Sequence, residues 1–317
     1  MGKLQLAIVV PVFNEEDSLM EFWNQLTNAL DDIGLFHEII FVNDGSYDGS
    51  LKILNSFQGH GVKVVDLTLN AGHMSALDAG YREADADWVV TMDSDLQHPP
   101  SVIASMIRTA QQSGVDVVYA TRSTRFEDSY FKRLSASVYY KLLRNLSGIP
   151  IHKNAADFRL ISNRVLDIIK ALPPGAHVFR LLIPGLGFPE ETFSYVASER
   201  IAGESKYNFG SMLRLAIRSI VSFSVRPLIF SIYIGLFFSL VSIIGLGYSL
   251  LSYVQGNTIP GWASLSSAVL LLFGILFFIL GILGTYLGEI WHRTSGMPDY
   301  FLNTPSKSTD GSNKEVD

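Results

Sequence analysis

Two aspartates, Asp93 and Asp95, stand directly after the apolar run 88–92, and Gln97 follows two positions later. Carboxylate and amide oxygens are the hard ligands that Mg²⁺ and Mn²⁺ prefer. Alternation along an extended segment would place the three side chains on one side of the chain. A cation held there could bridge a diphosphate and offset charge on a leaving group. We therefore predict a Mg²⁺ or Mn²⁺ site at Asp93, Asp95 and Gln97; the alternative is a strand end capped before the helix that begins at Pro99.

Residues 93–97, called the acidic turn below, follow one of several short apolar runs in the first 121 residues. The spacing predicts strands at 6–10, 39–42, 62–69, 88–92 and 115–120, with helices at 18–30, 74–84 and 99–112 between them. Continuous apolar strands that alternate with helices are typical of a parallel sheet covered on both faces. Ligands of such sheets bind at the carboxyl ends of the strands. We therefore expect the polar residues that follow these strands to gather at one edge.

The residues after the first three predicted strands fit a nucleotide pocket. The first strand is followed by 11–15, the second by 43–46 and the third by 70–73, and each stretch contains polar residues or glycine. Asp44 could belong to a simple turn, or its carboxylate could hold a base or a ribose hydroxyl. Neither a Gly-x-Gly-x-x-Gly pattern after the first strand nor a Walker A pattern is present, which disfavours dinucleotide cofactors and P-loop NTP hydrolysis.

The composition indicates a globular protein with a membrane part. The chain has 317 residues, of which 48% are apolar and 17% are charged, against about 25% charged residues in soluble domains. It contains no cysteine, which excludes disulfides, thiolate metal sites and cysteine nucleophiles. The formal net charge of −6 disfavours a generally basic nucleic-acid-binding protein.

The charge is spread unevenly along the chain. Residues 122–226 hold 16 Lys and Arg against 8 Asp and Glu, whereas residues 227–288 hold no charged residue. A basic segment beside an apolar one favours binding of anionic lipids or phosphate groups. Part of that positive charge is expected to be ordinary solvated surface.

Two membrane spans are predicted, at 227–254 and 263–288, because each exceeds the roughly 20 residues that cross a bilayer. The positive-inside rule places both termini and the globular domain in the cytoplasm, since basic residues flank the pair of spans at Arg214, Arg218, Arg226 and Arg293. Residues 211–226 alternate apolar and basic side chains, which predicts an amphipathic helix on the membrane surface or one packed on the globular domain.

The predicted organisation is a cytoplasmic domain at 1–210, the amphipathic helix at 211–226, two spans within 227–290 and a cytoplasmic tail at 291–317. Glycines in both spans are compatible with the close helix contacts of a homo-oligomer, although glycine is frequent in membrane helices generally.

Three segments carry a family resemblance: Val10-Pro11-Val12-Phe13-Asn14-Glu15, Val42-Asn43-Asp44-Gly45-Ser46, and Asp93-Ser94-Asp95-Leu96-Gln97-His98-Pro99-Pro100. Their order and spacing resemble those of family-2 glycosyltransferases. Together with Gly203-Glu204-Ser205-Lys206-Tyr207 and two terminal spans, they resemble the polyprenyl-phosphate glycosyltransferases over roughly residues 5–300. The resemblance implies a nucleotide-diphospho-sugar transferase fold, an α/β domain with a mostly parallel sheet.

The resemblance also implies roles for individual residues. Asp95 and Gln97 would hold the metal with Asp93, and Arg122 would lie near the phosphates. Asp157 sits where some relatives place an acidic active-site residue and others do not. The residues implied to bind the nucleotide sugar are Pro11, Asn14, Glu15, Asp44, Gly45, Ser46, Gly72 and Asp93. Those implied to bind the acceptor phosphate are Lys132, Arg133, Arg200 and Lys206.

The predicted reaction is a single, inverting sugar transfer from a nucleotide sugar, with UDP favoured over GDP, to a polyprenyl phosphate at the cytoplasmic membrane face. One alternative is a processive membrane glycan synthase, disfavoured because the chain lacks a Gln-x-x-Arg-Trp sequence. A second alternative is a nucleotide-sugar-binding scaffold without catalysis, disfavoured by the intact Asp93 and Asp95 pair.

Overall fold

The computed structural model of the protein describes residues 4–59, 61–122, 155–175, 177–195, 226–255, 261–295 and 298–303. Two compact units make up the chain. The first contains a seven-stranded sheet with its covering helices and a short return segment, residues 298–303. The second contains the two long helices α9 (Arg226–Val254) and α10 (Trp262–Thr294).

The strands of the first unit are β1 (Leu6–Val12), β2 (His37–Asn43), β3 (Val62–Asp66), β4 (Trp88–Thr91), β5 (Val117–Arg122), β6 (Ala155–Ser162) and β7 (Glu190–Tyr195). The helices described with them are α1 (Leu19–Ile33), α2 (Ser50–Ser56), α3 (His73–Glu83), the short 3₁₀ helix η1 (Pro100–Val102), α4 (Ile103–Ser113), α6 (Asn163–Ala171) and α7 (Phe179–Gly185).

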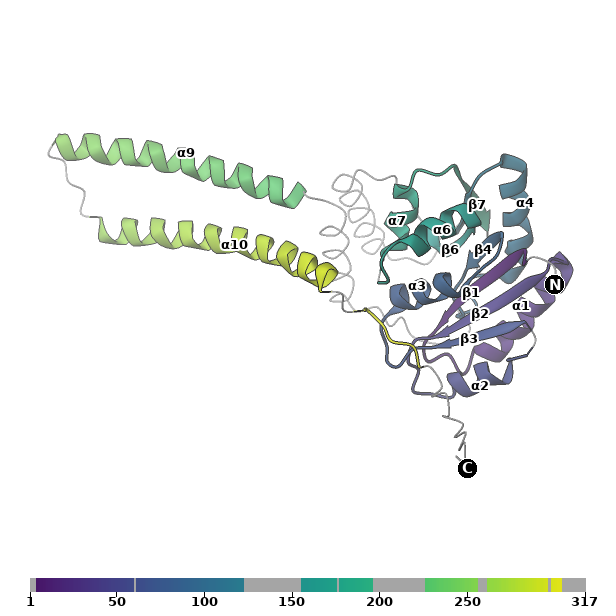
Figure 1. Ribbon diagram of the computed structural model, residues 1–317. Helices are drawn as coiled ribbons and strands as arrows, with labels where there is room; N and C mark the ends of the chain where they lie inside the picture. The colour runs from purple at the N-terminus through teal and green to yellow at the C-terminus, as the bar shows by residue number, and fades with distance from the viewer. Residues whose placement is uncertain are drawn as a thin grey trace, which may run out of the picture. The chain divides into compact units, whose positions relative to one another are not determined.

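The sheet has the order β3-β2-β1-β4-β6-β5-β7, and Figure 1 shows β1, β2 and β3 lying side by side. Strands β1 to β4 pair in parallel, as β5 does with β7, whereas β6 is antiparallel to both β4 and β5. The predicted mostly parallel sheet is therefore confirmed. Because β1, β2 and β4 run the same way, their carboxyl ends meet at one edge.

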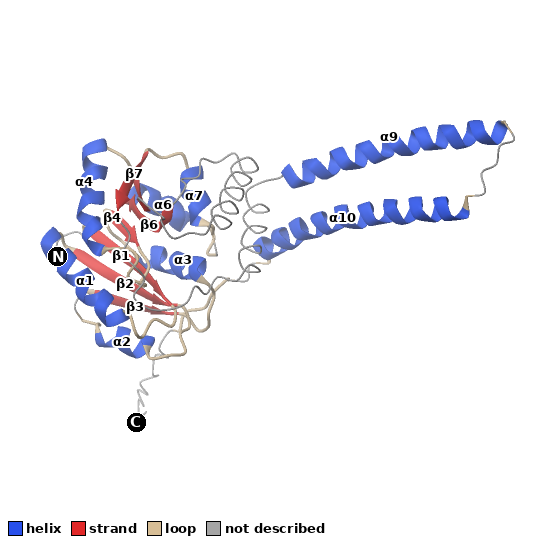
Figure 2. Ribbon diagram, turned by 180° about the vertical axis from the view of Figure 1, so that it is seen from behind, coloured by secondary structure: helices blue, strands red, loops and turns tan. Residues whose placement is uncertain are grey.

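Both faces of the sheet are covered, as Figures 1 and 2 show. Helices α1, α2 and α4 pack on one face, and α3, α6 and α7 pack on the other. Side chains of β1 alternate between the two cores, with Ile8 and Val10 on the first side and Ala7 and Val9 on the second. A strand buried on both sides needs apolar residues at every position, which is why β1 is a continuous apolar run.

The strands and helices predicted within the first 121 residues are all present, with shifted ends. The predicted strand at 62–69 stops at Asp66, and the helix predicted at 99–112 begins with a 3₁₀ turn at Pro100. The sequence predicts no strand or helix between residue 122 and the amphipathic helix at 211–226, so β6, β7, α6 and α7 are additions. Helix α2 was also not predicted.

Helices α9 and α10 are the second unit. Their segments Leu228–Gly245 and Leu271–Trp291 are long and apolar enough to cross a membrane, and only 6% and 0% of these segments are buried within the chain. A core helix of a soluble protein would be mostly buried, so this exposure favours a lipid environment. The predicted spans coincide with these helices, and α10 continues past residue 288 to Thr294. The predicted helix at 211–226 lies outside the described residues except for Arg226.

Candidate active site

The loops after β1 and β2 are locked together by hydrogen bonds. The backbone N–H of Asn14 donates to Ser46 Oγ at 3.1 Å, and the N–H of Tyr47 donates to Asn14 Oδ1 at 3.0 Å. Asn14 adopts a left-handed backbone with φ of 53°, a conformation that asparagine tolerates better than most residues. The predicted nucleotide-binding residues Asn14 and Ser46 are thus neighbours, as expected for loops at one edge of the sheet.

Asp44 ties the loop after β2 to the loop after β3. Its buried carboxylate accepts backbone N–H bonds from Ala71 at 2.7 Å and from Gly72 at 3.1 Å. Burial raises the pKa of Asp44, although these two hydrogen bonds and the nearby His73 act in the opposite direction. The carboxylate therefore supports the architecture of the pocket, and a direct contact with a nucleotide stays a prediction.

Two further predicted pocket residues contribute structural bonds. The backbone N–H of Glu15 donates to Ser50 Oγ at 2.9 Å, and the Glu15 carboxylate accepts from Ser18 Oγ at 3.0 Å. Pro11 lies within β1, and its carbonyl oxygen is 3.5 Å from the Oγ of Ser94. These bonds join the loop after β1 to the start of α2 and to the N-cap of α1, and they join β1 itself to the acidic turn.

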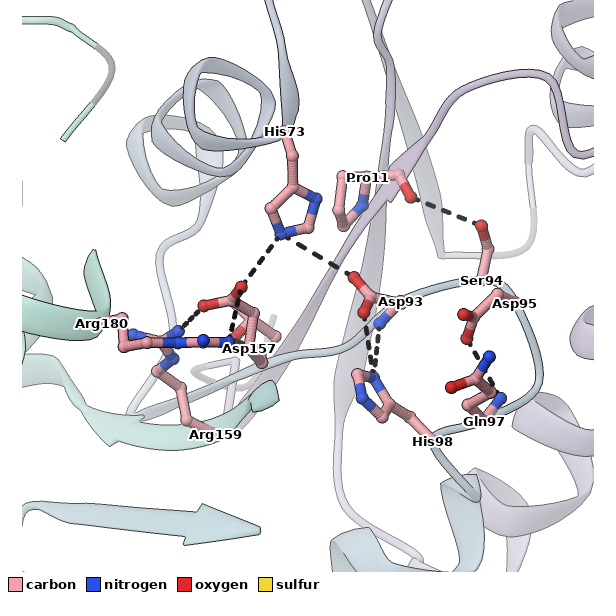
Figure 3. Close-up of polar contacts among 11 residues, drawn as sticks. Pro11, His73, Asp93, Ser94, Asp95, Gln97, His98, Asp157, Arg159 and Arg180 are labelled. Carbon is pink, nitrogen blue, oxygen red and sulfur yellow. Dashed lines mark hydrogen bonds and ion pairs between the residues drawn. The ribbon is translucent and has the colours of Figure 1, made fainter. Parts of the chain in front are cut away.

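The acidic turn after β4 is bent, whereas the sequence predicted an extended segment from Asp93 to Gln97. The strand ends at Thr91, and Leu96 has a left-handed backbone with φ of 62°. Figure 3 shows the Asp93 carboxylate directed toward His73 and His98, whereas Asp95 lies beside Gln97. The Asp95 Oδ1 accepts the backbone N–H of Gln97 at 3.1 Å. The prediction that all three side chains share one side of an extended segment is therefore wrong, because the chain turns within the motif.

His73 joins this turn to strand β6. Its Nε2 lies 3.5 Å from Asp157 Oδ2 and 3.9 Å from Asp93 Oδ1, as Figure 3 shows. His73 begins α3 directly after Gly72, whose backbone has a φ of 92°. Burial lowers the pKa of His73, but the hydrogen bond with Asp157 and the charges of Asp93 and Asp157 outweigh it, so the pKa is raised. The imidazole thus lies between two carboxylates that favour its protonated form.

Asp157 is held by two arginines. Arg159, two positions along β6, contacts the Asp157 carboxylate directly, and Arg180 of α7 lies 3.8 Å from Asp157 Oδ2. Burial would raise the pKa of Asp157, but the charges of Arg159 and Arg180 and the bond with His73 lower it far below its ordinary value. Asp157 is therefore ionised at neutral pH and surrounded by cations, a poor arrangement for taking up a proton.

His98 supports the acidic turn by a hydrogen bond to the backbone of Asp93. Its Nδ1 accepts the backbone N–H of Asp93 at 3.0 Å, and its ring stacks on Phe158 with the centroids 5.1 Å apart. The same Nδ1 lies 3.6 Å from Asp93 Oδ2. His98 is buried, and its hydrogen bond to the Asp93 N–H therefore anchors the start of the acidic turn.

The oxygen donors of Asp93, Asp95 and Gln97 suit a hard divalent ion in their chemistry. Both carboxylates are partly exposed, at the sheet edge where ligands of parallel sheets bind. Among the described residues, no group of three or more His, Asp and Glu side chains is placed to hold a metal. A site here would therefore need the Gln97 amide and ligand oxygens to complete it.

Several predicted residues cannot be compared with the structure. Lys132, Arg133, Arg200 and Lys206 lie outside the described residues, and the described part of Arg122 is its backbone at the end of β5. The sequence reasoning did not assign Arg159, Arg180 or His98 to the site. The alternation of Asp157, Phe158 and Arg159 could have shown that the two charges share one side of a strand. No local pattern links Arg180 to Asp157.

Residues 7–169 match the model of the family described as glycosyl transferase family 2. The chain belongs to glycosyltransferase family 2 and is a glycosyltransferase. This family 2 enzyme is 37% identical over 302 residues to the uncharacterized glycosyltransferase YkcC of Bacillus subtilis, covering 94% of this chain and 93% of the relative. It is 36% identical over 302 residues to the bactoprenol glucosyl transferase of Shigella phage SfII, covering 94% of this chain and 97% of the relative.

The fold of this family 2 enzyme has a counterpart among solved structures. Glucosyl-3-phosphoglycerate synthase from Mycobacterium tuberculosis, in complex with Mn²⁺, UDP and glucosyl-3-phosphoglycerate, matches with a TM-score of 0.52 at 21% identity. The match covers 69% of this chain and 80% of the synthase. The predicted nucleotide-diphospho-sugar transferase fold is thereby confirmed.

Proposed function

We propose that the protein transfers one sugar, with inversion at the anomeric carbon, from a UDP-sugar to a polyprenyl phosphate such as undecaprenyl phosphate. The observation that carries this proposal is the position of His73, within 4 Å of both Asp93 in the acidic turn and Asp157. Asp157, Arg159 and Arg180 form the cationic cluster. The proposed diphosphate site at Asp93 and the cationic side chains around Asp157 would therefore adjoin at the carboxyl edge of the sheet. That pairing suits a reaction between two phosphorylated substrates.

The relatives support the choice of substrates. Bactoprenol glucosyl transferases align over 94% of this chain at 36% identity, and bactoprenol is a polyprenyl lipid. The Mycobacterium tuberculosis synthase with the same fold binds UDP and Mn²⁺. The two apolar helices would place the enzyme in the membrane that carries such a lipid. We propose that its globular domain and both termini lie on the cytoplasmic side of the cell membrane.

The acceptor phosphate can act as the nucleophile without a general base. A phosphate monoester has a second pKa near 6 and is largely dianionic at neutral pH. One of its oxygens would attack the anomeric carbon while the bond from that carbon to the diphosphate oxygen breaks, and the electron pair leaves with the nucleoside diphosphate. No proton needs to be removed from the acceptor, in contrast to transfer onto a hydroxyl.

Asp157 then acts as a positioning residue. Its ionised carboxylate holds the guanidinium groups of Arg159 and Arg180 and the imidazole of His73 at one place. Oriented cations of this kind stabilise phosphate groups by charge and by directed N–H donors. We propose that Arg180 and His73, which are both partly exposed, face the substrates, while buried Arg159 fixes Asp157.

The remaining proposed roles concern phosphate and metal binding. Asp93, Asp95 and Gln97 would hold the divalent ion, whose charge offsets the negative charge that develops on the leaving diphosphate. Asn14, Ser46 and the loops around Asp44 would form the nucleoside pocket. Basic residues from the end of β5 to the start of α9 would bind the two substrates' phosphates, namely Arg122, Lys132, Arg133, Arg200 and Lys206.

The direct test is sugar transfer by the full chain purified in detergent. Protein would be mixed with undecaprenyl phosphate, Mg²⁺ or Mn²⁺, and one radiolabelled UDP- or GDP-sugar at a time, and label would be counted in the organic phase. We expect label from one UDP-sugar as a single sugar on the lipid. A polymeric product would instead support a processive synthase, and nucleotide binding without transfer from any donor would contradict the proposal.

A further inference from the structure

The return segment, residues 298–303, follows the end of α10 by four residues and packs on the first unit. It pairs antiparallel to the chain just beyond β3, with a bridge between Leu67 and Leu302. The N–H of Thr68 donates to the Phe301 carbonyl at 3.0 Å, and the N–H of Asn303 donates to the Asp66 carbonyl at 2.7 Å. Since β3 is an edge strand, the return segment covers the end of that edge.

A relay of side chains runs from the return segment to the pocket loop. Asn303 Nδ2 donates to Asp66 Oδ2 at 2.9 Å, and Asn43 Nδ2 donates to Asp66 Oδ1 at 2.6 Å. The Asn43 Oδ1 accepts the N–H of Ser46 at 3.2 Å, and Ser46 Oγ accepts the N–H of Asn14 at 3.1 Å. Asn43 is buried, so the bonds of its amide set the position of the loop. Three hydrogen-bonded residues, Asp66, Asn43 and Ser46, thus connect Asn303 to Asn14.

The return segment also supports the loop after β3 by its backbone. Thr68, which is bonded to Phe301, is followed by Leu69, whose backbone lies against Gly45. A Cβ built on Gly45 would lie 2.4 Å from the carbonyl carbon of Leu69. The loop after β2 and the loop after β3 are therefore in close backbone contact at Gly45 and Leu69. We expect a displacement of Thr68 to displace the loop that contains Gly45.

A second contact joins the return segment to α3. The hydroxyl of Tyr300 donates to Asp78 Oδ2 at 3.1 Å, and the buried Asp78 also pairs with Arg82 at 2.8 Å. Helix α3 begins at His73 of the candidate site. The segment therefore contacts both elements that border the loop of residues 67–72, namely the end of β3 and helix α3.

We infer that the return segment positions the nucleotide pocket, with Asn303 and Asp66 as positioning residues for donor binding. This inference rests on the proposed function, because it assigns donor binding to the loops of Asn14, Asp44 and Ser46. The return segment, which follows α10 in the chain, thereby supports the donor site. Among the described residues, Asp157, Arg159 and Arg180 share none of the bonds of the relay.

The test compares variants of the full chain in detergent for UDP binding with Mn²⁺ by calorimetry and for donor and acceptor KM. Asn303→Asp places two carboxylates together, and we expect about tenfold weaker UDP binding and a similar rise in donor KM. Asp66→Asn leaves one of two amide donors without an acceptor and should weaken binding about threefold to tenfold. The acceptor KM should be unchanged in both, and Asn55→Asp, the same change at an exposed site in α2, should match the wild type.

The double variant Asp66→Asn with Asn303→Asp separates positioning from mere folding. Its amide at position 66 can accept from Asn43 and donate to the new carboxylate at position 303, so UDP affinity should return to within about twofold of wild type. Unchanged donor KM in Asn303→Asp, or no recovery in the double variant, would overturn the inference while leaving the proposed function intact. Wild-type protein that binds neither UDP nor any UDP-sugar would overturn both.

Discussion

Asp157 and Arg159 project from the same side of β6 with their charged groups in direct contact, and the Arg159 guanidinium is only 1% exposed. The partners of the two charges differ. Asp157 also lies within 4 Å of His73 and Arg180, whereas the Nε and Nη1 of Arg159 have no hydrogen-bond partner among the described residues. The buried arginine therefore depends on Asp157 more than Asp157 depends on it.

This asymmetry predicts the stability of three variants. Asp157→Asn leaves a buried guanidinium without its counter-charge and should lower the free energy of unfolding by about 3 kcal/mol or more. Arg159→Met should cost less, because Asp157 keeps two cations, and Asp157→Asn with Arg159→Met should be more stable than Asp157→Asn alone. Unfolding followed by tryptophan fluorescence would measure this. An Asp157→Asn variant as stable as wild type would contradict the pairing, and all three variants should lose sugar transfer.

A second prediction concerns the contact of Gly45 with Leu69. Gly45→Ala combines a left-handed backbone, φ of 63°, with a Cβ that overlaps the Leu69 backbone. Gly34→Ala is the matched control, because Gly34 has φ of 64° with no atom within 4 Å of its Cβ position. The control should be destabilised only by the backbone strain of a left-handed alanine, which lowers the free energy of unfolding by about 1 kcal/mol. Gly45→Ala should lose more stability and also raise the donor KM; equal effects in both variants would show that the loop contact does not matter.

Much of the fold could be predicted because of how the strands are buried. Strands β1 and β2 supply both cores, so Leu6–Val12 and the residues around Ile39 are apolar at nearly every position. Strand β6 was missed because two of its positions, Asp157 and Arg159, carry charges into the interior. Strand β7 was missed because it is an edge strand in which three of the six residues are exposed and Tyr195 alone is buried.

The candidate site could be predicted where strand ends create it. Asn14, Asp44 and Asp93 each follow a parallel strand, and topology alone brings such residues to one edge. Arg180 comes from α7 and meets Asp157 only through the packing of that helix on the sheet. The contact of Asp93 with His73 likewise depends on the packing of α3 on the sheet. The left-handed backbone at Leu96 is a further feature that no spacing rule anticipates.

The environment of His73 predicts a pH dependence of stability. Its pKa is raised above the ordinary value of 6.5, so the folded state binds this proton more tightly than the unfolded state. The stabilisation is fully present below pH 6.5 and is lost as the pH rises through the folded-state pKa. The wild type should therefore lose stability relative to His73→Gln as the pH rises above 6.5 and through the folded-state pKa. Parallel unfolding midpoints of the two proteins across this range would contradict the raised pKa.

Metal dependence is predicted to reside in Asp95. In Asp95→Asn the side-chain oxygen can still accept the N–H of Gln97, the bond that shapes the turn, so the variant should fold normally. It loses the negative charge that a divalent ion needs, and sugar transfer should fall by about 100-fold or more. The exposed Asp85→Asn is the control for loss of one carboxylate and should keep wild-type turnover. EDTA should abolish transfer by the wild type and Mn²⁺ should restore it, whereas wild-type turnover in Asp95→Asn would refute the assignment of the metal to this turn.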